Sequence, residues 1–463
     1  MKISLCLVAL ISLFNSCSSS SPDTKGGGTG TPLPTTPTAP VTALTDTEAL
    51  DQVQKDAIKY FWDYAEPNSK LGRERYHTDN PSFESNKVTT GGSGFGLMTL
   101  IVGVERGFIP RVEAVSRMTT AMDFLDKADR FHGAWAHWMD GTTGHAISFG
   151  NKDDGGDIVE TAFLCQGLIA VREYFKNGNT QEMALSAKAD NLWKGVEWSW
   201  YTNGENAMYW HWSPTYQWEM KFKLEGYNEC LIAYILGAAS PTHPIPAAAY
   251  HEGWARSGTI VTGKTQYGIP LIFKYNTVNG NAGPLFWAQY SYLGLDPSQL
   301  SDQYANYWDL TQNQAKIIYS HCVANPKGWK GYSEKCWGLT ASYSRNTDGT
   351  TGYSAHDTDN DLGVITPTAA LSSFPYTPTE SMKFLHYLYD EKKSDYVGIA
   401  GPYDAFSPNY NWVTPRYLAI DQGTIAPMIE NYRSGLIWKL FMNAPEVKPG
   451  LEKLGFHSTK YNF

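Results

Sequence analysis

Residues Asn151–Phe175 read NKDDGGDIVETAFLCQGLIAVREYF. This stretch opens with acids and glycines and then becomes a helix, because its apolar residues recur close to a 3.6-residue period and no proline interrupts them. Asp157 and Glu160 are three residues apart and share one face of the first turn. Asp153 lies four residues upstream of Asp157 and can fold back over the same helix end. The simplest interpretation of these acids is helix capping, since helix N-termini favour negative charge.

The first forty residues have the composition of an exported and tethered protein. Residues 1–16 carry one lysine and an apolar run too short to cross a bilayer, which is typical of a secretory signal peptide. Cys17 follows in a sequence that resembles a relaxed lipobox of bacterial lipoproteins. Residues 17–40 are rich in Ser, Gly, Thr and Pro, so we expect a disordered linker. We expect a lipoprotein anchored at Cys17 in the periplasm or at the cell surface; the alternative is an ordinary cleaved signal with an incidental cysteine.

Residues 41–463 are expected to form one domain, because no second linker divides them. The net charge of −9 argues against nucleic acid or an anionic membrane surface as a partner, which leaves the lipid as the only expected link to a membrane. Neither a CxxC motif nor a histidine-rich cluster suggests a metal, and the glycine-rich openings lack a phosphate-binding lysine. We therefore expect no metal and no cofactor. Cys322 and Cys336 could pair, and the sequence leaves this open.

Helical periodicity dominates this domain. Six segments begin with Gly, Pro or an acid and continue as small-residue, almost wholly apolar helices. A helix that is apolar nearly all round is buried on all sides, and an amphipathic helix covers it. This alternation predicts an all-α (α/α)6 barrel, with an irregular α-solenoid as the alternative. The buried segments are residues 91–107, 155–175, 225–240, 283–295, 366–378 and 421–441, and the covering helices include 45–65, 111–127, 180–201, 302–321 and 379–391.

The loops between these helices are dense in aromatic residues, and the whole chain has 16 tryptophans and 29 tyrosines. Aromatic rings are usually core material. A tryptophan at a loop end beside polar residues nevertheless suits stacking against the apolar face of a sugar ring. The residues that we expect to bind substrate are Trp138, Trp210, Trp212, Tyr227 and Trp337.

Acidic residues open three of the six buried segments. The N-termini of the inner helices of an (α/α)6 barrel converge at one end, so these acids are expected to face one cavity. They are Asp153, Asp157 and Glu160 from the second segment, Glu225 and Glu229 from the third, and Asp421 from the sixth. Crowded carboxylates raise one another's pKa, so one can stay protonated as a general acid while another acts as a base. Hydrolysis of a glycosidic bond requires this pairing.

Longer motifs support the same interpretation. The sequences GGSGFGLM, KDDGGDIVETAFL, WHWSPTYQWEM, EGYNECL and LAIDQGTIAPMIENYRSGL resemble those of the bacterial glycoamylase-like family, and the resemblance extends from about Gln52 to Phe456. That family includes β-1,2-glucan hydrolases, some endo-acting and some releasing sophorose. The resemblance implies an (α/α)6 barrel and anomer-inverting hydrolysis without a metal. By this resemblance, the catalytic acids of the family correspond to Asp153, Asp157, Glu160, Glu229 and Asp421. Glu225 matches none of them. Tyr343 and Leu362 depart from the family pattern, which leaves the subsites and the exact substrate open.

The leading hypothesis is a glycoside hydrolase that acts on a β-glucan, in the first place a β-1,2-linked one. A glucoamylase-like α-glucan hydrolase, a non-catalytic lipid-anchored glycan-binding protein and a polysaccharide lyase are the alternatives. Glu229 is the expected general acid, because apolar neighbours on a helix disfavour its charged form. The expected base is Asp421 or one of Asp153 and Asp157, since the first turn of a helix favours the ionised form. Glu160 is expected to orient the sugar or to tune the other acids.

Overall fold

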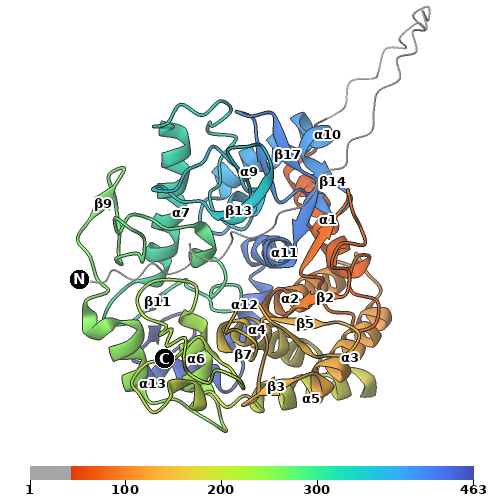
Figure 1. The fold of residues 1–463 in the computed structure, drawn as a ribbon, viewed down its shortest axis with the longest axis vertical. Helices are drawn as coiled ribbons and strands as arrows, with labels where there is room; N and C mark the ends of the chain where they lie inside the picture. The colour runs from red at the N-terminus through yellow and green to blue at the C-terminus, as the bar shows by residue number, and fades with distance from the viewer. Residues whose placement is uncertain (1–42) are drawn as a thin grey trace, which may run out of the picture.

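The computed structural model describes residues 43–463 of the chain, which form a ring of inner helices surrounded by outer ones (Figure 1). The outer helices are α1 (Asp46–Trp62), α3 (Arg111–Lys127), α5 (Thr180–Lys194), the π-helix η2 (Ala249–Trp254), α7 (Tyr307–Ala324) and α9 (Pro378–His386). The inner ones are α2 (Thr90–Glu105), α4 (Ile158–Phe175), α6 (Leu231–Ala239), the 3-10 turn η4 (Leu285–Ala288), α8 (Pro367–Leu371) and α11 (Ala419–Arg433). Outer and inner elements alternate along the chain, so the predicted (α/α)6 barrel is confirmed.

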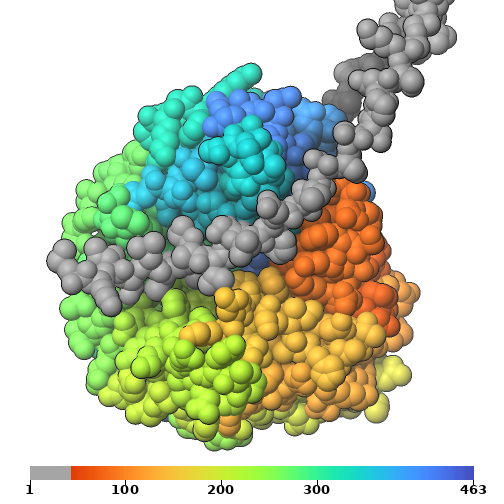
Figure 2. Space-filling view, in the orientation of Figure 1, coloured from red at the N-terminus to blue at the C-terminus, as the bar shows by residue number. Residues whose placement is uncertain are grey.

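The ring closes where the last inner helix packs beside the first. Helix α11 contacts α1, α2 and α8, and α2 in turn contacts α4. In Figure 2 the colours follow the chain around the outline from orange through yellow and green to blue, and blue meets orange again. This closure excludes the open solenoid. The remaining helical segments are η1 (Trp200–Thr202), η3 (Arg256–Gly258), η5 (Tyr387–Glu391), α10 (Lys393–Tyr396), α12 (Leu436–Met442) and α13 (Val447–Lys453).

Strands among the described residues form only small sheets of two or three strands each. The longest pair joins β12 (Ala341–Arg345) to β13 (Thr351–Ala355), and β7 (Gly156–Asp157) pairs with β8 (His211–Trp212) at the start of α4. The other strands are β1 (Arg75–His77), β2 (Lys87–Thr89), β3 (Arg130–Phe131), β4 (Ala134–Trp135), β5 (Trp138–Asp140), β6 (Ala146–Ile147), β9 (Thr265–Gln266), β10 (Ile269–Pro270), β11 (Leu300–Ser301), β14 (Val397–Gly398), β15 (Gly401–Pro402), β16 (Ala405–Ser407), β17 (Trp412–Thr414), β18 (Arg416–Leu418) and β19 (His457–Ser458).

Two glycines let the inner helices α2 and α4 touch. A Cβ atom on Gly94 would lie 2.4 Å from the Cα of Leu164, and one on Gly167 would lie 2.3 Å from the carbonyl oxygen of Gly94. Neither position can hold a side chain without moving a backbone, so the two helices cross at direct backbone contact. The small-residue composition of the buried segments is therefore a packing requirement.

Helix α11 carries a proline in its interior, Pro427. A proline has no N–H, so the carbonyl oxygen of Gly423, four residues earlier, loses its helical donor. The hydroxyl of Thr99 on α2 donates to that oxygen at 3.1 Å. A neighbouring inner helix thus supplies the hydrogen bond that Pro427 removes.

Two inner segments are shorter than expected. Residues 283–295 form only η4, because Gly283 and Pro284 open the segment and its bulky aromatic side chains lose rotamer freedom in a helix. Helix α8 ends at Leu371, and it could not continue far beyond this residue because Phe374, which precedes Pro375, is disfavoured in the helical conformation.

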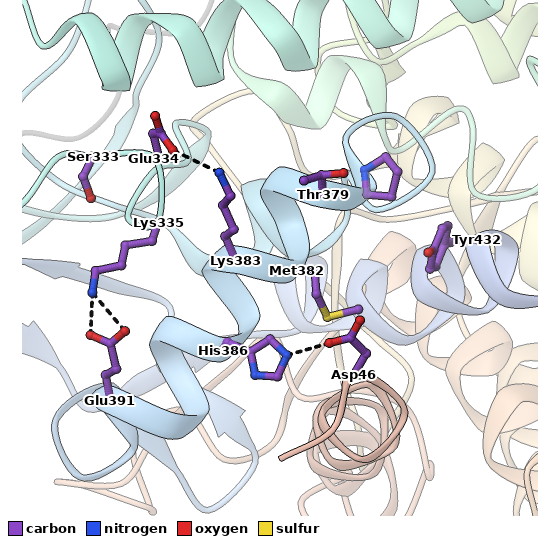
Figure 3. A pocket seen from close by; sticks show the side chains of 11 residues that line it. Asp46, Ser333, Glu334, Lys335, Thr379, Met382, Lys383, His386, Glu391 and Tyr432 are labelled. Atoms are coloured by element: carbon purple, nitrogen blue, oxygen red, sulfur yellow. Dashed lines mark hydrogen bonds and ion pairs between the residues drawn. The ribbon is translucent and has the colours of Figure 1, made fainter. Parts of the chain in front are cut away.

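The chain enters the ring at the N-terminus of α1, where α11 ends. Asp46 bonds to Nε2 of His386 at 2.9 Å, and it lines a pocket of about 840 Å³ together with Tyr432 (Figure 3). Helices α1 and α11 run antiparallel, since Asp51 near the start of α1 pairs with Arg433 at the end of α11 at 2.6 Å. The entry point therefore lies at the end of the ring opposite to the first residues of α11.

All four cysteines in the described part of the chain are buried free thiols, so Cys322 and Cys336 do not pair. None of the helices within residues 43–463 combines the length and the apolar composition that a membrane span requires. Cys17 and the segments that we expect to form a signal peptide (1–16) and a linker (17–40) lie outside the described residues.

Candidate active site

The structure brings four of the predicted catalytic acids together where α4 and α6 begin. Asp153, Asp157, Glu160 and Glu229 are all buried, and the most accessible of them, Asp153, is 7% exposed. Their charges act on one another: burial first, and then Glu160 and Asp157, raise the pKa of Glu229. These acids come from two inner helix openings, as the sequence predicted.

Asp157 is the N-cap of α4, and all of its acceptor positions are filled. Oδ1 accepts from the N–H groups of Val159 and Glu160, both at 2.9 Å. Oδ2 accepts from Nε1 of Trp210 at 2.9 Å and lies 2.8 Å from Nδ1 of His137. A carboxylate has about four acceptor positions, so Asp157 has none left for a reacting water. The capping interpretation therefore holds for this residue.

Glu160 is held by the opening of α2. Its Oε2 accepts from the N–H of Gly91 at 2.7 Å and from the hydroxyl of Thr89 at 3.4 Å. A Cβ atom on Gly91 would lie 2.6 Å from that oxygen, so the contact requires a glycine. Burial raises the pKa of Glu160 to about 7, although the nearby charge of His137 opposes the rise.

His137 stands between these acids, and sequence reasoning missed it. Nδ1 faces Asp157, and Nε2 lies 3.9 Å from Oε1 of Glu160. The imidazole ring stacks on Phe149 with centroids 3.9 Å apart. Burial disfavours its charge, but Glu160, Asp157 and Asp153 outweigh burial and raise its pKa to about 9. His137 is therefore an imidazolium at neutral pH and compensates part of the acidic charge. The only signal for it in the sequence is its place beside Trp138.

His137, Asp153 and Asp157 form a group with the spacing of a cation site, since their nearest ligand atoms lie within 4.8 Å of one another. An imidazolium has no free lone pair to offer a metal, and Asp157 already accepts four hydrogen bonds. The donor set therefore fits an internal ion cluster in which the histidine itself supplies the positive charge.

Asp153 keeps a free acceptor. Its Oδ1 is buried and has no hydrogen-bond partner among the described residues. Burial, followed by the charge of Asp157, raises the pKa of Asp153 to about 6, while His137 and His211 oppose the rise. Asp153 is therefore ionised at neutral pH with one oxygen available.

Glu229 lies in the turn before α6, whereas the pattern predicted a helix already from residue 225. The helix starts late because Gly226 adopts a positive φ of 76° and the Asn228 side chain accepts from the N–H of Cys230 at 3.0 Å. The Glu229 carboxyl accepts no hydrogen bond from another described side chain, and burial raises its pKa to about 7. The expected protonation is thus supported even though the expected position was wrong.

Asp421 lies in the first turn of α11, where we expected the helix terminus to keep it ionised. That expectation was wrong, because burial and then Asp404 raise the pKa of Asp421 well above its usual range. Asp404 is a buried loop acid that sequence reasoning missed, since it opens no helix. The hydroxyl of Tyr290 donates to Oδ1 of Asp421 at 3.3 Å, and its pKa is raised by burial, by Asp421 and further by Glu160 and Glu229. Tyr290 therefore links Asp421 to the other acids.

The predicted sugar-binding rings divide into two groups. Tyr227 and Trp337 are both 0% exposed. The Tyr227 hydroxyl donates to Gln314 at 2.9 Å and the Trp337 Nε1 donates to the carbonyl oxygen of Glu380 at 3.3 Å, so both rings belong to the core and cannot stack on a sugar. The three half-buried rings are Trp138, Trp210 and Trp212. Trp210 touches the acid cluster directly through its bond to Asp157.

Solved structures place this architecture among known proteins. An endo-β-1,2-glucanase from Chitinophaga pinensis, solved in complex with sophorotriose and glucose, is 55% identical. The alignment covers 90% of this chain and 100% of that chain, with a TM-score of 0.87. The chain belongs to the glycoamylase-like family. The family model described as "Glycoamylase: Putative glucoamylase" matches residues 221–445 of this glycoamylase-like chain.

A second relative is a longer protein. The exo β-1,2-glucooligosaccharide sophorohydrolase (non-reducing end) of Parabacteroides distasonis is 44% identical over 433 residues. The match covers 89% of this glycoamylase-like chain but only 58% of the relative, so the chain spans little more than half the length of that curated protein. A solved β-1,2-glucanase from Parabacteroides distasonis is 43% identical, with 89% of this chain and 60% of that chain covered and a TM-score of 0.82.

Proposed function

We propose that this chain is a glycoside hydrolase that cleaves β-1,2-linked glucan, with Glu229 as general acid and Asp421 as general base. The observation that carries the proposal is the state of Glu229. It is a buried carboxyl whose pKa is raised to about 7, so about half of the molecules hold its proton at pH 7, and no described side chain hydrogen-bonds to it. A general acid needs these two properties.

The chemistry needs one proton delivered and one removed. Glu229 protonates the glycosidic oxygen as the bond between that oxygen and the anomeric carbon breaks. A water attacks the anomeric carbon from the opposite face, and the base takes the proton that this water loses. One water is consumed, and the two carboxyls return to their starting states by exchanging protons with solvent. Inversion of the anomeric centre follows from the opposite-face attack.

The contacts of the remaining acids support Asp421 as the base. Asp157 has no acceptor position for a water. Asp153 has one, but it comes from the same helix opening as Asp157 and Glu160, beside the charge of His137. Asp421 instead comes from a different inner helix and reaches the acid cluster through Tyr290. This arrangement suits an acid and a base that act from two sides of one sugar.

The substrate class is supported by three relatives that are 43–55% identical and whose names specify β-1,2-glucan substrates or products. The half-buried rings of Trp138, Trp210 and Trp212 suit stacking against sugar rings. The family description favours an α-glucan as the second candidate.

The test is incubation with β-1,2-glucan, β-1,3-glucan, cellulose oligomers and maltooligosaccharides, followed by separation of the products. We expect oligosaccharides from β-1,2-glucan alone, released first as the α-anomer in NMR spectra. Glu229→Gln and Asp421→Asn should each fold normally and lose on the order of 10²-fold or more in kcat. Products from maltooligosaccharides, or near-normal turnover by Glu229→Gln, contradict the proposal.

We also propose that the protein is a lipoprotein, exported to the periplasm or cell surface and anchored through Cys17. The support is the short apolar run of residues 1–16 before this cysteine and the unfoldable composition of residues 17–40. Cys17→Ser should move the protein from the membrane fraction to the soluble fraction. A variant that stays with membranes contradicts the anchor and leaves the catalytic proposal untouched.

A further inference from the structure

We propose that Asp404 is a positioning residue for this reaction: it shares a single proton with Asp421 and thereby fixes the orientation and the charge of that carboxyl group. The use assigned to the pair rests on the proposed hydrolase function. The pair itself is a feature of the described residues.

The two carboxyls are buried against each other. Oδ1 of Asp404 and Oδ2 of Asp421 are both shielded from solvent and find no N–H or O–H donor among the described residues. The two side chains hydrogen-bond to each other. Ionised carboxylates only accept hydrogen bonds, so this bond requires one proton between the two groups. Two adjacent buried negative charges would repel strongly, which favours the same singly protonated state.

Separate elements hold the two partners. Oδ2 of Asp404 accepts from the N–H of Tyr343 on β12 at 2.7 Å, and the Asp404 N–H donates to the carbonyl oxygen of Arg416 on β18 at 3.0 Å. The Tyr343 ring is fixed in turn by a 2.7 Å bond between its hydroxyl and Nε2 of His77. Asp421 is fixed by α11 and by Tyr290. The pair therefore joins the strand region to the last inner helix with little freedom on either side.

The charges around the pair come from several elements. Arg75 of β1 and the adjacent Glu74 form an ion pair, and they shift the pKa of Asp404 in opposite directions. Burial is the largest effect and raises the pKa of Asp404 to about 6. The titratable groups that face the pair are Glu74, Arg75, Tyr290, Tyr343 and Tyr353. Glu74 and Arg75 have opposite effects on the pKa of Asp404. The single negative charge of the pair is therefore maintained mainly by the proton that the two carboxyls share.

This arrangement resolves how a buried aspartate can serve as a base. Burial and Asp404 raise the pKa of Asp421 further than that of Asp404, so the shared proton rests on Asp421, and Asp421 becomes a base when this proton passes across the bond to Asp404. When Asp421 takes a proton from the attacking water, the pair holds two protons, one on each carboxyl. One proton then passes to solvent before the next turnover. The apparent ionisation constants belong to the pair rather than to either residue.

Infrared spectroscopy tests the pair without relying on activity. Wild-type protein with ¹³C-labelled aspartate should show the C=O band of a protonated carboxyl at neutral pH, and Asp404→Asn and Asp421→Asn should each lose it. Asp296→Asn is the matched control, because Asp296 is fully buried but accepts only from Ser298, Lys460 and Tyr461. It should keep the band. A wild type without the band, or a band that survives both substitutions, overturns the proposal. Asp421→Asn breaks the pair while leaving Asp404 unchanged. It therefore tests the shared proton even where Asp404→Asn fails to fold.

The pH profile of kcat tests the positioning role. In Asp404→Asn the amide donates to Asp421 and no second proton competes, so the acidic limb should move to lower pH by about one unit or more. The maximum kcat should fall less than tenfold, against a loss on the order of 10²-fold in Asp421→Asn. An unmoved acidic limb, or an equal loss in both variants, overturns the positioning role. A wild type that cleaves no β-1,2-glucan refutes the proposed function instead, and the infrared result still decides whether the pair exists.

Discussion

Glu160 of α4 accepts a hydrogen bond from the backbone N–H of Gly91 at the start of α2, with 2.7 Å between the two atoms. The bond ties a buried acid to the opening of the neighbouring inner helix. It also explains why that helix begins with a glycine pair, because a side chain at position 91 would occupy the space of the carboxylate.

Gly91→Ala should displace Glu160. The new Cβ atom would lie 2.6 Å from Oε2 of Glu160 and 2.9 Å from the ring of Phe163. Small displacements of an active-site group cost up to about 10²-fold in rate, so we expect kcat on β-1,2-glucan to fall at least tenfold. Gly263→Ala is the control, since a Cβ atom at Gly263 meets nothing within 4 Å. Equal kcat values for the two variants contradict the role given to this contact.

His137→Gln should change the pH profile. His137 opposes the rise in the pKa of both Glu160 and Asp153. Without its positive charge these pKa values rise further, so the acidic limb of kcat/KM should move to higher pH. His145→Gln, at an exposed site paired with Asp129 at 3.2 Å, is the control and should leave the limb in place. If the acidic limb of kcat/KM is unchanged in His137→Gln, the imidazolium does not set the ionisation of Glu160 and Asp153.

Glu229→Gln should stabilise the protein at alkaline pH. The folded-state pKa of Glu229 is raised from 4.5 to about 7, so its contribution to stability is complete below pH 4.5 and is lost as the pH rises through 7. At pH 8 the variant avoids a buried charge and should be more stable by on the order of 2 kcal/mol. At pH 4 the two proteins should unfold at nearly the same temperature. Thermal unfolding at both pH values, with the exposed Glu113→Gln as control, measures this; a variant less stable at pH 8 contradicts it.

Thr99→Val should cost about 1 kcal/mol, because the carbonyl oxygen of Gly423 then loses its donor. In a Pro427→Ala background the residue at 427 regains an N–H for that oxygen, so the cost of Thr99→Val should shrink. A double-mutant cycle by denaturant unfolding measures the coupling. Thr311→Val is the control, since the Thr311 hydroxyl donates within its own helix to Tyr307 at 3.0 Å. Equal costs of Thr99→Val in both backgrounds would show no coupling.

The barrel was predictable because its inner helices carry a strong and simple signal. Apolar stretches such as residues 91–107 and 155–175 recur with amphipathic helices between them, and burial on all sides is the only stable place for them. Helix-opening acids were equally visible, so the grouping of Asp157, Glu160 and Glu229 followed from the barrel geometry. The fourth segment failed as a helix because periodicity does not measure the cost of bulky side chains there.

Other features of the site leave no periodic trace in the sequence. Asp404 and His137 lie outside the helices, and only the folding of distant elements brings them to the acids. Composition also does not separate the buried Trp337 from the half-buried Trp210, because an aromatic ring suits both a core and a sugar site. The charge of Asp421 was misjudged because a helix terminus contributes about 1 kcal/mol, and burial beside a second carboxyl outweighs that.

The antiparallel packing of α1 against α11 gives the barrel a front and a back. Asp421 lies near one end of α11 and Arg433 at the other, about 18 Å apart along the axis at 1.5 Å per residue. The chain enters beside Arg433, whose guanidinium donates a hydrogen bond to Asp51 near the start of α1. The chain therefore joins the barrel at the end opposite to the first turn of α11. Under the proposed lipid anchor, the end of α11 that carries Asp421 faces away from the anchored end, which leaves that side of the barrel clear for a long polymer.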